Sequence, residues 1–131
     1  MEPYPAEKLK QRTKDFALRV IRLFRSLPRT EEARILGRQL LRSATSVAAD
    51  YRAACRARSR ADFVSKMGVI VEEADETLLW LELPVEGNTF ASNRIDAMMA
   101  EAGEILAICA ASQMTAHAGG RSGPGNRQSI N

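Results

Sequence analysis

The chain has 131 residues, 45% of them hydrophobic, 27% charged and 5% aromatic, and this is the composition of one globular domain rich in strong helix formers. Its net charge of +3 is uneven, because residues 1–66 carry 16 Lys/Arg against 7 Asp/Glu whereas residues 67–131 carry 3 against 9. No apolar run approaches the roughly 18 residues of a membrane span and the N-terminus lacks the apolar segment of a signal peptide, so we expect a cytoplasmic protein with no membrane partner.

Two long helices are predicted in the basic half. From Ala6 to Leu27, between two prolines, apolar residues recur every three or four positions, which is the spacing of one helical face. A second helix begins after Thr30, a good N-cap followed by two glutamates, and its apolar pattern continues for about 25 residues. Gly37 and several alanines make its inward face small, so a neighbouring helix can approach closely.

Two further helices are predicted in the acidic half. Ser59 is a second candidate N-cap, and Asp62 takes the place of the usual glutamate of a capping box. The apolar pattern then continues to Leu83, and Pro84 is expected to stop the helix. The last helix is predicted over about residues 90–114.

These helices are expected to form one domain. Long helices joined by short links favour antiparallel neighbours, so the predicted fold is all-α, an up-down-up-down four-helix bundle over residues 1–117. From residue 118 the sequence AGGRSGPGNRQSIN offers no apolar surface to bury. We therefore expect a disordered Gly/Ser-rich tail over residues 118–131.

An ordered series of short motifs occupies the second and third predicted helices. A Leu-x-x-Gln-x-x-Arg-Ser segment is followed by a Ser-Val pair, an Arg-Ser segment leading to Phe, and three glutamates. The residues are Leu36, Gln39, Arg42 and Ser43; Ser46 and Val47; Arg58, Ser59 and Phe63; and Glu72, Glu73 and Glu76. This series resembles the bacterial four-helix-bundle family of 23S ribosomal RNA intervening-sequence proteins, over about residues 6–115.

The resemblance implies a cytoplasmic bundle that assembles into a homo-oligomeric ring, often a homopentamer. Some relatives look like accessory proteins that bring nucleic acid to a reverse transcriptase, which implies both as partners. The family has no established catalytic residue to carry over. One departure concerns residues 50–54, where this chain has Asp-Tyr-Arg-Ala-Ala in place of Asn-Ile-Ala-Glu-Gly.

Arginines of the second helix are the candidate nucleic-acid-binding residues. Arg34, Arg38 and Arg42 are spaced i, i+4 and i+8, and the same helical face continues to Arg52 and Arg56. Guanidinium groups hold phosphate oxygens bidentately, and such contacts release counterions. Alternatively, these arginines pair with acids of the third or fourth helix, within the chain or in a neighbouring subunit, or they stay solvated.

Arg58 and Arg60 extend this basic set into the next turn. In a symmetric ring, these two and Arg56 would crowd on one rim, where a bound anion would relieve their repulsion. This favours anion binding at the turn and carboxylate pairing at Arg34 and Arg38.

Acidic and aromatic residues of the third helix are candidates for an oligomer interface. Glu72, Glu73 and Glu76 would be the acidic partners there, and Trp80 would either anchor the interface or join the core. Tyr51 lies among the arginines without a second aromatic residue to complete a stacking platform, so core packing is predicted.

No motif predicts catalysis, a cofactor or a metal. His117 has no partner in a fixed element, and the glutamates lack the Glu-x-x-His pairs of metal-binding bundles. Cys55 and Cys109 have neither CxxC nor metal spacing and predict small buried thiols in a reducing cytosol. The predicted function is a non-enzymatic homo-oligomer that binds RNA or DNA through the second helix or, alternatively, a self-assembling protein-interaction scaffold.

Overall fold

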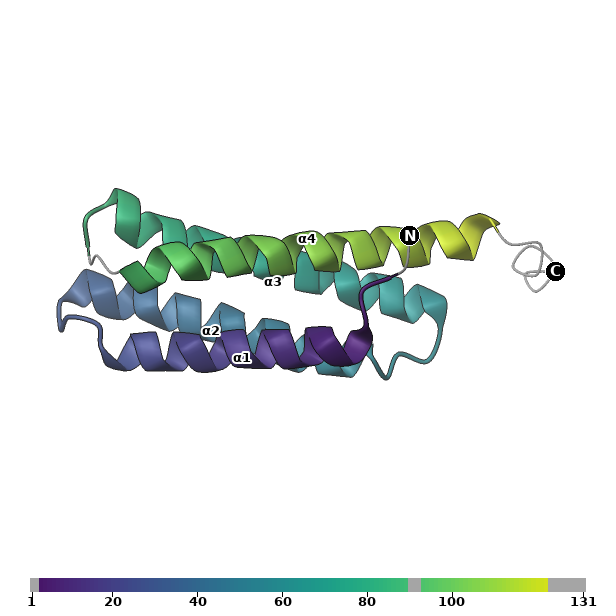
Figure 1. Cartoon of the computed structure of the whole chain (residues 1–131), viewed down its shortest axis with the longest axis horizontal. Helices are drawn as coiled ribbons and strands as arrows, with labels where there is room; N and C mark the ends of the chain where they lie inside the picture. Colours follow the sequence, from purple (N-terminus) through teal and green to yellow (C-terminus); the bar gives the residue numbers. More distant parts are fainter. Residues whose placement is uncertain (1–2, 90–92, 123–131) are drawn as a thin grey trace.

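The computed structural model describes residues 3–89 and 93–122, and these form four helices (Figure 1). Their bounds are α1 Ala6–Arg25, α2 Glu31–Ala54, α3 Arg60–Glu86 and α4 Asn93–Ser122. Consecutive helices run antiparallel, and the described ranges contain no strand. The prediction of an all-α chain with four helices is confirmed, and assembly into a ring stays a prediction.

Side-chain caps start α2 and α3 where the sequence predicted them. The Thr30 hydroxyl accepts the Ala33 N–H at 3.2 Å, and the Ser59 hydroxyl accepts the Asp62 N–H at 3.0 Å. Each cap satisfies an amide that has no carbonyl partner inside its helix. The Asp62 carboxylate accepts the N–H of Arg58 at 3.2 Å, one residue before the cap, and so closes the α2–α3 turn.

α3 continues past the predicted stop. Pro84 lies inside its last turn, and the helix ends at Glu86. Proline lacks the N–H that would bond the carbonyl four residues earlier, but the turn is held by the Gly87 N–H, which donates to the Leu83 carbonyl at 2.8 Å. The proline ring is also fully buried. The prediction that Pro84 stops the helix is therefore wrong, because the ring packs in the core while only one helical hydrogen bond is lost.

α4 is also longer than predicted, since it reaches Ser122 and includes His117. Its end projects beyond the other helices in Figure 1. Alanines before the end favour continued helix, and the Arg60 guanidinium donates to the Ala116 carbonyl at 3.4 Å. The predicted tail is thus helical over residues 118–122, and its remainder, residues 123–131, lies outside the described residues.

Inward-facing side chains of all four helices form one core. Those with almost no exposure are Leu9, Val20 and Leu23 of α1, Leu40 of α2, Met67, Ile70 and Leu81 of α3, and Ile95, Met98 and Cys109 of α4. A cavity of about 10 Å³ lies at the mid-bundle alanines Ala44, Ala74 and Ala102. It holds at most one water molecule, so a ligand does not fit there.

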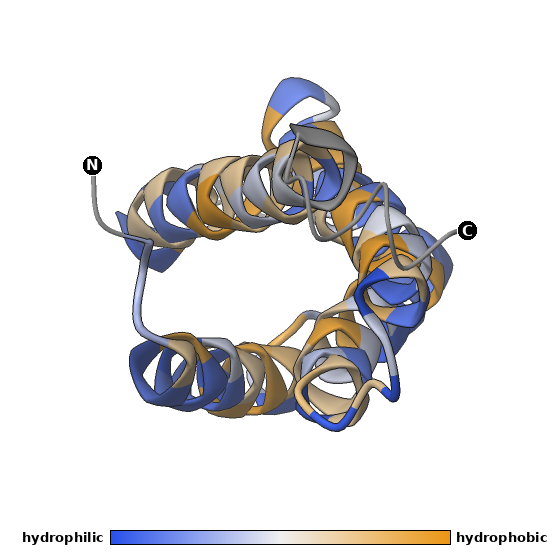
Figure 2. Ribbon diagram, turned by 90° about the vertical axis from the view of Figure 1, so that its right-hand side faces the viewer, coloured by the Kyte–Doolittle hydropathy of each residue, from blue (hydrophilic) through white to orange (hydrophobic). Residues whose placement is uncertain are grey.

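The helices follow one another around this core. α2 lies between α1 and α3, α3 lies between α2 and α4, and α1 meets α4 more sparsely; Figure 2 shows the four helices end-on around a common interior. Between α2 and α3 the buried Ser43 and Thr77 hydroxyls are 2.9 Å apart, which satisfies two polar groups inside the core. The outer face of α2 remains open to solvent.

Candidate nucleic-acid interface

The arginine stripe, defined as Arg34, Arg38, Arg42, Arg52 and Arg56, follows the outer face of α2. All five residues are exposed, and the buried residues of α2 occupy the opposite side of the helix. The first four span about 27 Å at the rise of an α-helix, and Arg56 follows just past the end of α2. Arg34, Arg38, Arg42 and Arg52 therefore form a row of cations on one helix, and Arg56 continues the stripe into the turn.

No carboxylate of the described residues neutralises this stripe. The ion pairs within 4.0 Å in residues 3–89 and 93–119 join Lys10 to Glu7, Arg12 to Glu101 and Glu104, and Lys66 to Asp62. Arg42 influences an acid without pairing to it, since its charge partly offsets the raised pKa of Glu73. Ion pairs with acids of the described chain therefore do not account for the stripe arginines.

The α2–α3 turn places Arg58 and Arg60 at one end of the bundle, and both are exposed. Arg60 reaches across to α4, because its Nη1 lies 3.4 Å from the Ala116 carbonyl oxygen. Arg58 is held through its backbone N–H by Asp62. Hydrogen bonds from Lys66 and from this N–H lower the pKa of the Asp62 carboxyl. The two turn arginines thus extend the basic surface from α2 toward α4.

α1 contributes basic residues beside the stripe, and the sequence analysis missed them. A surface hollow of about 170 Å³ is lined by Arg52 together with Glu7, Lys10, Gln11 and Lys14. Glu7 is engaged with Lys10 at 2.7 Å, whereas Lys14 forms no ion pair among the described residues. The i, i+4 spacing of the two lysines was a visible signal, but only the packing of α1 on α2 places them next to Arg52.

The three candidate interface acids of α3 are not equivalent. Glu72 and Glu76 are exposed, whereas Glu73 is half-buried. Burial and hydrogen bonding to Asp50 of α2 raise the pKa of the Glu73 carboxyl to about 7, because two neighbouring carboxyls resist ionising together. The Glu73 Oε1 atom is buried without a hydrogen-bond donor in the described structure. Glu73 is therefore engaged inside the chain, and Glu72 and Glu76 are the acids available to another subunit.

Aromatic and cysteine residues divide between core and surface. Tyr51 is 3% exposed, which confirms the prediction that it packs in the core, and Trp80 is half-buried against that core. Burial raises the pKa of the Cys109 thiol to about 11. Cys55 is exposed, so the prediction of a buried thiol is wrong there, because the chain leaves the core at this C-cap of α2.

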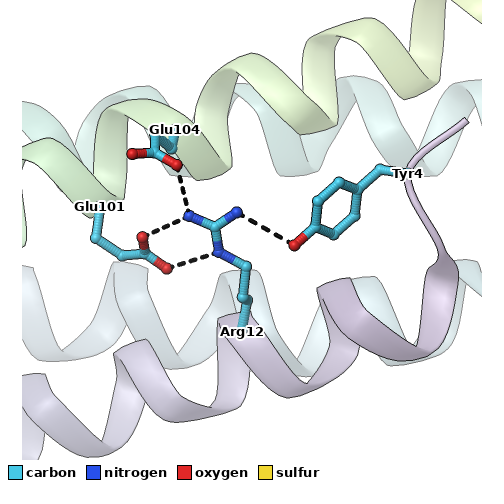
Figure 3. Close-up of polar contacts among 4 residues, drawn as sticks. All are labelled: Tyr4, Arg12, Glu101 and Glu104. Carbon is cyan, nitrogen blue, oxygen red and sulfur yellow. Dashed lines mark hydrogen bonds and ion pairs between the residues drawn. The ribbon is translucent and has the colours of Figure 1, made fainter. Parts of the chain in front are cut away.

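A cluster centred on Arg12 joins α1 to α4 (Figure 3). Arg12 Nε and Nη2 donate to the two oxygens of Glu101 at 2.9 and 2.6 Å. Nη2 also donates to Glu104 at 2.8 Å, and Nη1 donates to the Tyr4 hydroxyl at 3.2 Å. These bonds raise the pKa of the Arg12 guanidinium above its ordinary value. The opposite charges of the two halves of the sequence signalled such pairing without identifying these residues.

Other kinds of site receive no support from the described residues. They contain no group of three or more His, Cys, Asp or Glu side chains that could hold a metal ion, and His117 is exposed on α4. None of the described helices combines the length and the apolar character needed to cross a membrane.

Fold and surface together define a four-helix bundle with exposed arginines along the outer face of α2. The model of the family described as "23S rRNA-intervening sequence protein" matches residues 7–111, and the chain belongs to this family. It is similar to the crystal structure of a protein with unknown function from the S23 ribosomal protein family of Bacteroides thetaiotaomicron VPI-5482, with a TM-score of 0.76 and 29% identity over 83% of this chain and 97% of that chain. No curated protein matches the chain. The family resemblance derived from the motifs is confirmed.

Proposed function

We propose that this protein is a non-enzymatic, cytoplasmic, homo-oligomeric bundle that binds the backbone of RNA or DNA through the arginine stripe. The observation that carries the proposal is a row of five exposed arginines without a carboxylate partner among the described residues. Like charges at i, i+4 repel one another along a helix, and phosphates bound between them would relieve that repulsion. Guanidinium groups also match phosphate oxygens in geometry as well as charge.

In the proposed assembly, several copies of the stripe act together. The outer face of α3 combines exposed Val69, Leu79 and Leu83 with the acids Glu72 and Glu76, and this face suits contact with a second copy. A ring, a pentamer by analogy with the family, would repeat the stripe around its axis, and multivalent contacts would raise the avidity for a long strand. A reverse transcriptase would then be the enzyme that receives the bound nucleic acid.

A second candidate function is a self-assembling scaffold, in which α2 of one subunit faces α3 of the next. Ile35 favours this alternative, because it lies beside the stripe and is 52% exposed. An apolar residue bordered by arginines complements a face of apolar residues and glutamates. In this arrangement Glu72 and Glu76 of the neighbour would neutralise stripe arginines that have no partner in their own described chain.

A filter-binding titration against structured RNA and duplex DNA, at several salt concentrations, tests the first candidate. We expect affinity to fall as salt rises, and R52A/R56A to weaken binding by roughly tenfold and to reduce the log–log salt slope by about two. K8A/R19A is the matched control, because it also removes two charges, but from the face of α1 that points away from Lys10, Lys14 and the stripe. Lys8 on that face lies 5.8 Å from the Tyr4 ring. Salt-independent binding, or equal losses in both variants, would contradict phosphate contacts.

Light scattering on the same variants separates the two candidates. If the stripe binds nucleic acid, R52A/R56A keeps the oligomeric mass of the wild type while its affinity falls. If the stripe joins subunits, E72Q/E76Q and R52A/R56A both reduce the mass, and neither the wild type nor the variants bind nucleic acid.

A further inference from the structure

A second concave basic surface lies at the α1–α2 turn, at the opposite end of α2 from the α2–α3 turn. We call it the turn hollow, and its volume is about 290 Å³. Four arginines line it, Arg25 and Arg29 before α2 and Arg34 and Arg38 on α2. Its remaining lining is apolar and consists of Phe24, Leu27 and Pro28. Arg34 and Arg38 belong to both surfaces, so the turn hollow is continuous with the arginine stripe.

The apolar floor of the turn hollow depends on Gly37. A Cβ at this position would lie 2.5 Å from Leu27 Cδ1 and 3.2 Å from Phe24 Cδ1. A side chain at this position would displace the end of the Leu27 side chain, so glycine allows Leu27 and Phe24 to rest closely against α2. Pro28 then ends the α1 side of the turn, and Thr30 caps α2. The result is an apolar surface framed by guanidinium groups rather than a filled helix–helix contact.

No acid of the described residues forms an ion pair with an arginine of this hollow. All four arginines are exposed, and none takes part in the ion pairs of the described chain. Glu31 and Glu32 lie in the first turn of α2, but they neither line the hollow nor pair with its arginines. Four cations around one concave surface suit a ligand with more negative charge than a single phosphodiester.

We propose that the turn hollow binds a nucleotide that carries a terminal phosphate, at the end of a single strand whose backbone lies on the arginine stripe. This inference rests on the proposed nucleic-acid binding. A terminal phosphate carries about −1.5 to −2 charges near neutral pH, which suits several arginines. Half-buried Phe24 and exposed Pro28 line the hollow and offer the terminal base an apolar contact, and a volume near 300 Å³ is at the lower end of ligand pockets.

Fluorescence anisotropy with labelled 12-nucleotide single strands tests this proposal. The strands carry a 5′-phosphate, a 3′-phosphate or hydroxyls at both ends, and a circular single strand of the same composition has no end. We expect one phosphorylated strand to bind at least about fivefold more tightly than the hydroxyl strand. R25A/R29A should abolish this preference and lower the affinity for the circle by much less than the affinity for the phosphorylated strand. R52A/R56A should weaken binding of every strand and keep the preference.

Equal affinity of the wild type for phosphorylated and hydroxyl ends would overturn the terminal-nucleotide proposal while leaving stripe binding intact. Failure of every strand, and of structured RNA and duplex DNA as well, to bind would instead refute the proposed function. Thermal shift with a nucleoside monophosphate and with inorganic phosphate then examines the hollow alone. If the nucleoside monophosphate raises the melting temperature of the wild type but not of R25A/R29A, a free nucleotide also binds in the hollow. If neither compound raises the melting temperature of the wild type, the hollow is not a binding site.

Discussion

Arg12 and the arginine stripe show two opposite uses of the same side chain. Arg12 is held by two glutamates and a tyrosine, and its side chain is 26% exposed. The stripe arginines are exposed and have no carboxylate within 4.0 Å among the described residues. The difference lies in the neighbouring helix, because α1 faces Glu101 and Glu104 of α4 whereas the outer face of α2 faces no helix of its own chain.

This difference indicates which cations hold the fold together and which are available to a partner. A bidentate, half-buried guanidinium–carboxylate pair stabilises a sparse helix contact, whereas exposed arginines on an already packed helix add little to stability. Removing one cation of each kind should therefore separate folding from binding.

Arg12→Ala should have the largest effect on stability. It leaves Glu101, whose side chain is 21% exposed, without its donor, and the expected loss is about 2 kcal/mol of unfolding free energy. Urea denaturation of Arg12→Ala and of the matched stripe variant Arg38→Ala measures the contrast, since the latter should stay within about 0.5 kcal/mol of the wild type. Equal losses would remove the distinction between the two kinds of arginine.

Asp50→Asn should have an intermediate effect that depends on pH. In the fold the pKa of Glu73 is raised from 4.5 to about 7, so the stability gained from its protonated form is complete below pH 4.5 and is lost as pH rises through about 7. An asparagine amide would donate to ionised Glu73 and remove the repulsion. We expect a gain of about 1 kcal/mol at pH 8 and little change at pH 4.5, as measured by thermal melts. A gain that is equal at both pH values would contradict repulsion between the Asp50 and Glu73 carboxylates, and Glu72→Gln, which removes an exposed carboxylate of the same helix, serves as the control.

Thr30→Ala should have the smallest effect. The variant loses the hydrogen bond that caps the start of α2, at a cost of about 0.5–1 kcal/mol, and it loosens the turn between Arg29 and Arg34. Calorimetry measures the loss of stability. In the anisotropy assay, the preference for a phosphorylated strand end over a hydroxyl end should fall more than the affinity for the circular strand. The comparison variant is Ser59→Ala, which removes the cap at the other turn and should leave that end preference unchanged.

Sequence alone determined the number and type of the helices, their caps at Thr30 and Ser59, the family, and the alignment of Arg34, Arg38, Arg42 and Arg52 on one helical face. These features follow from local periodicity and capping chemistry, which a linear pattern records directly. Pro84 and the end of α4 escaped prediction because the cost of a lost helical bond or of a polar helix end is offset by contacts with other helices.

Only the tertiary structure decided which charges meet. Arg12 and Glu101 are separated by 89 positions, and no local spacing distinguishes Arg12 from its unpaired neighbours on the helical wheel. Asp50 and Glu73 likewise share an environment only because α2 packs on α3. Lys14 lies next to Arg52, and Leu27 and Phe24 pack against Gly37, for the same reason. Electrostatic partners and concave surfaces arise between helices, so packing geometry rather than periodicity selects them.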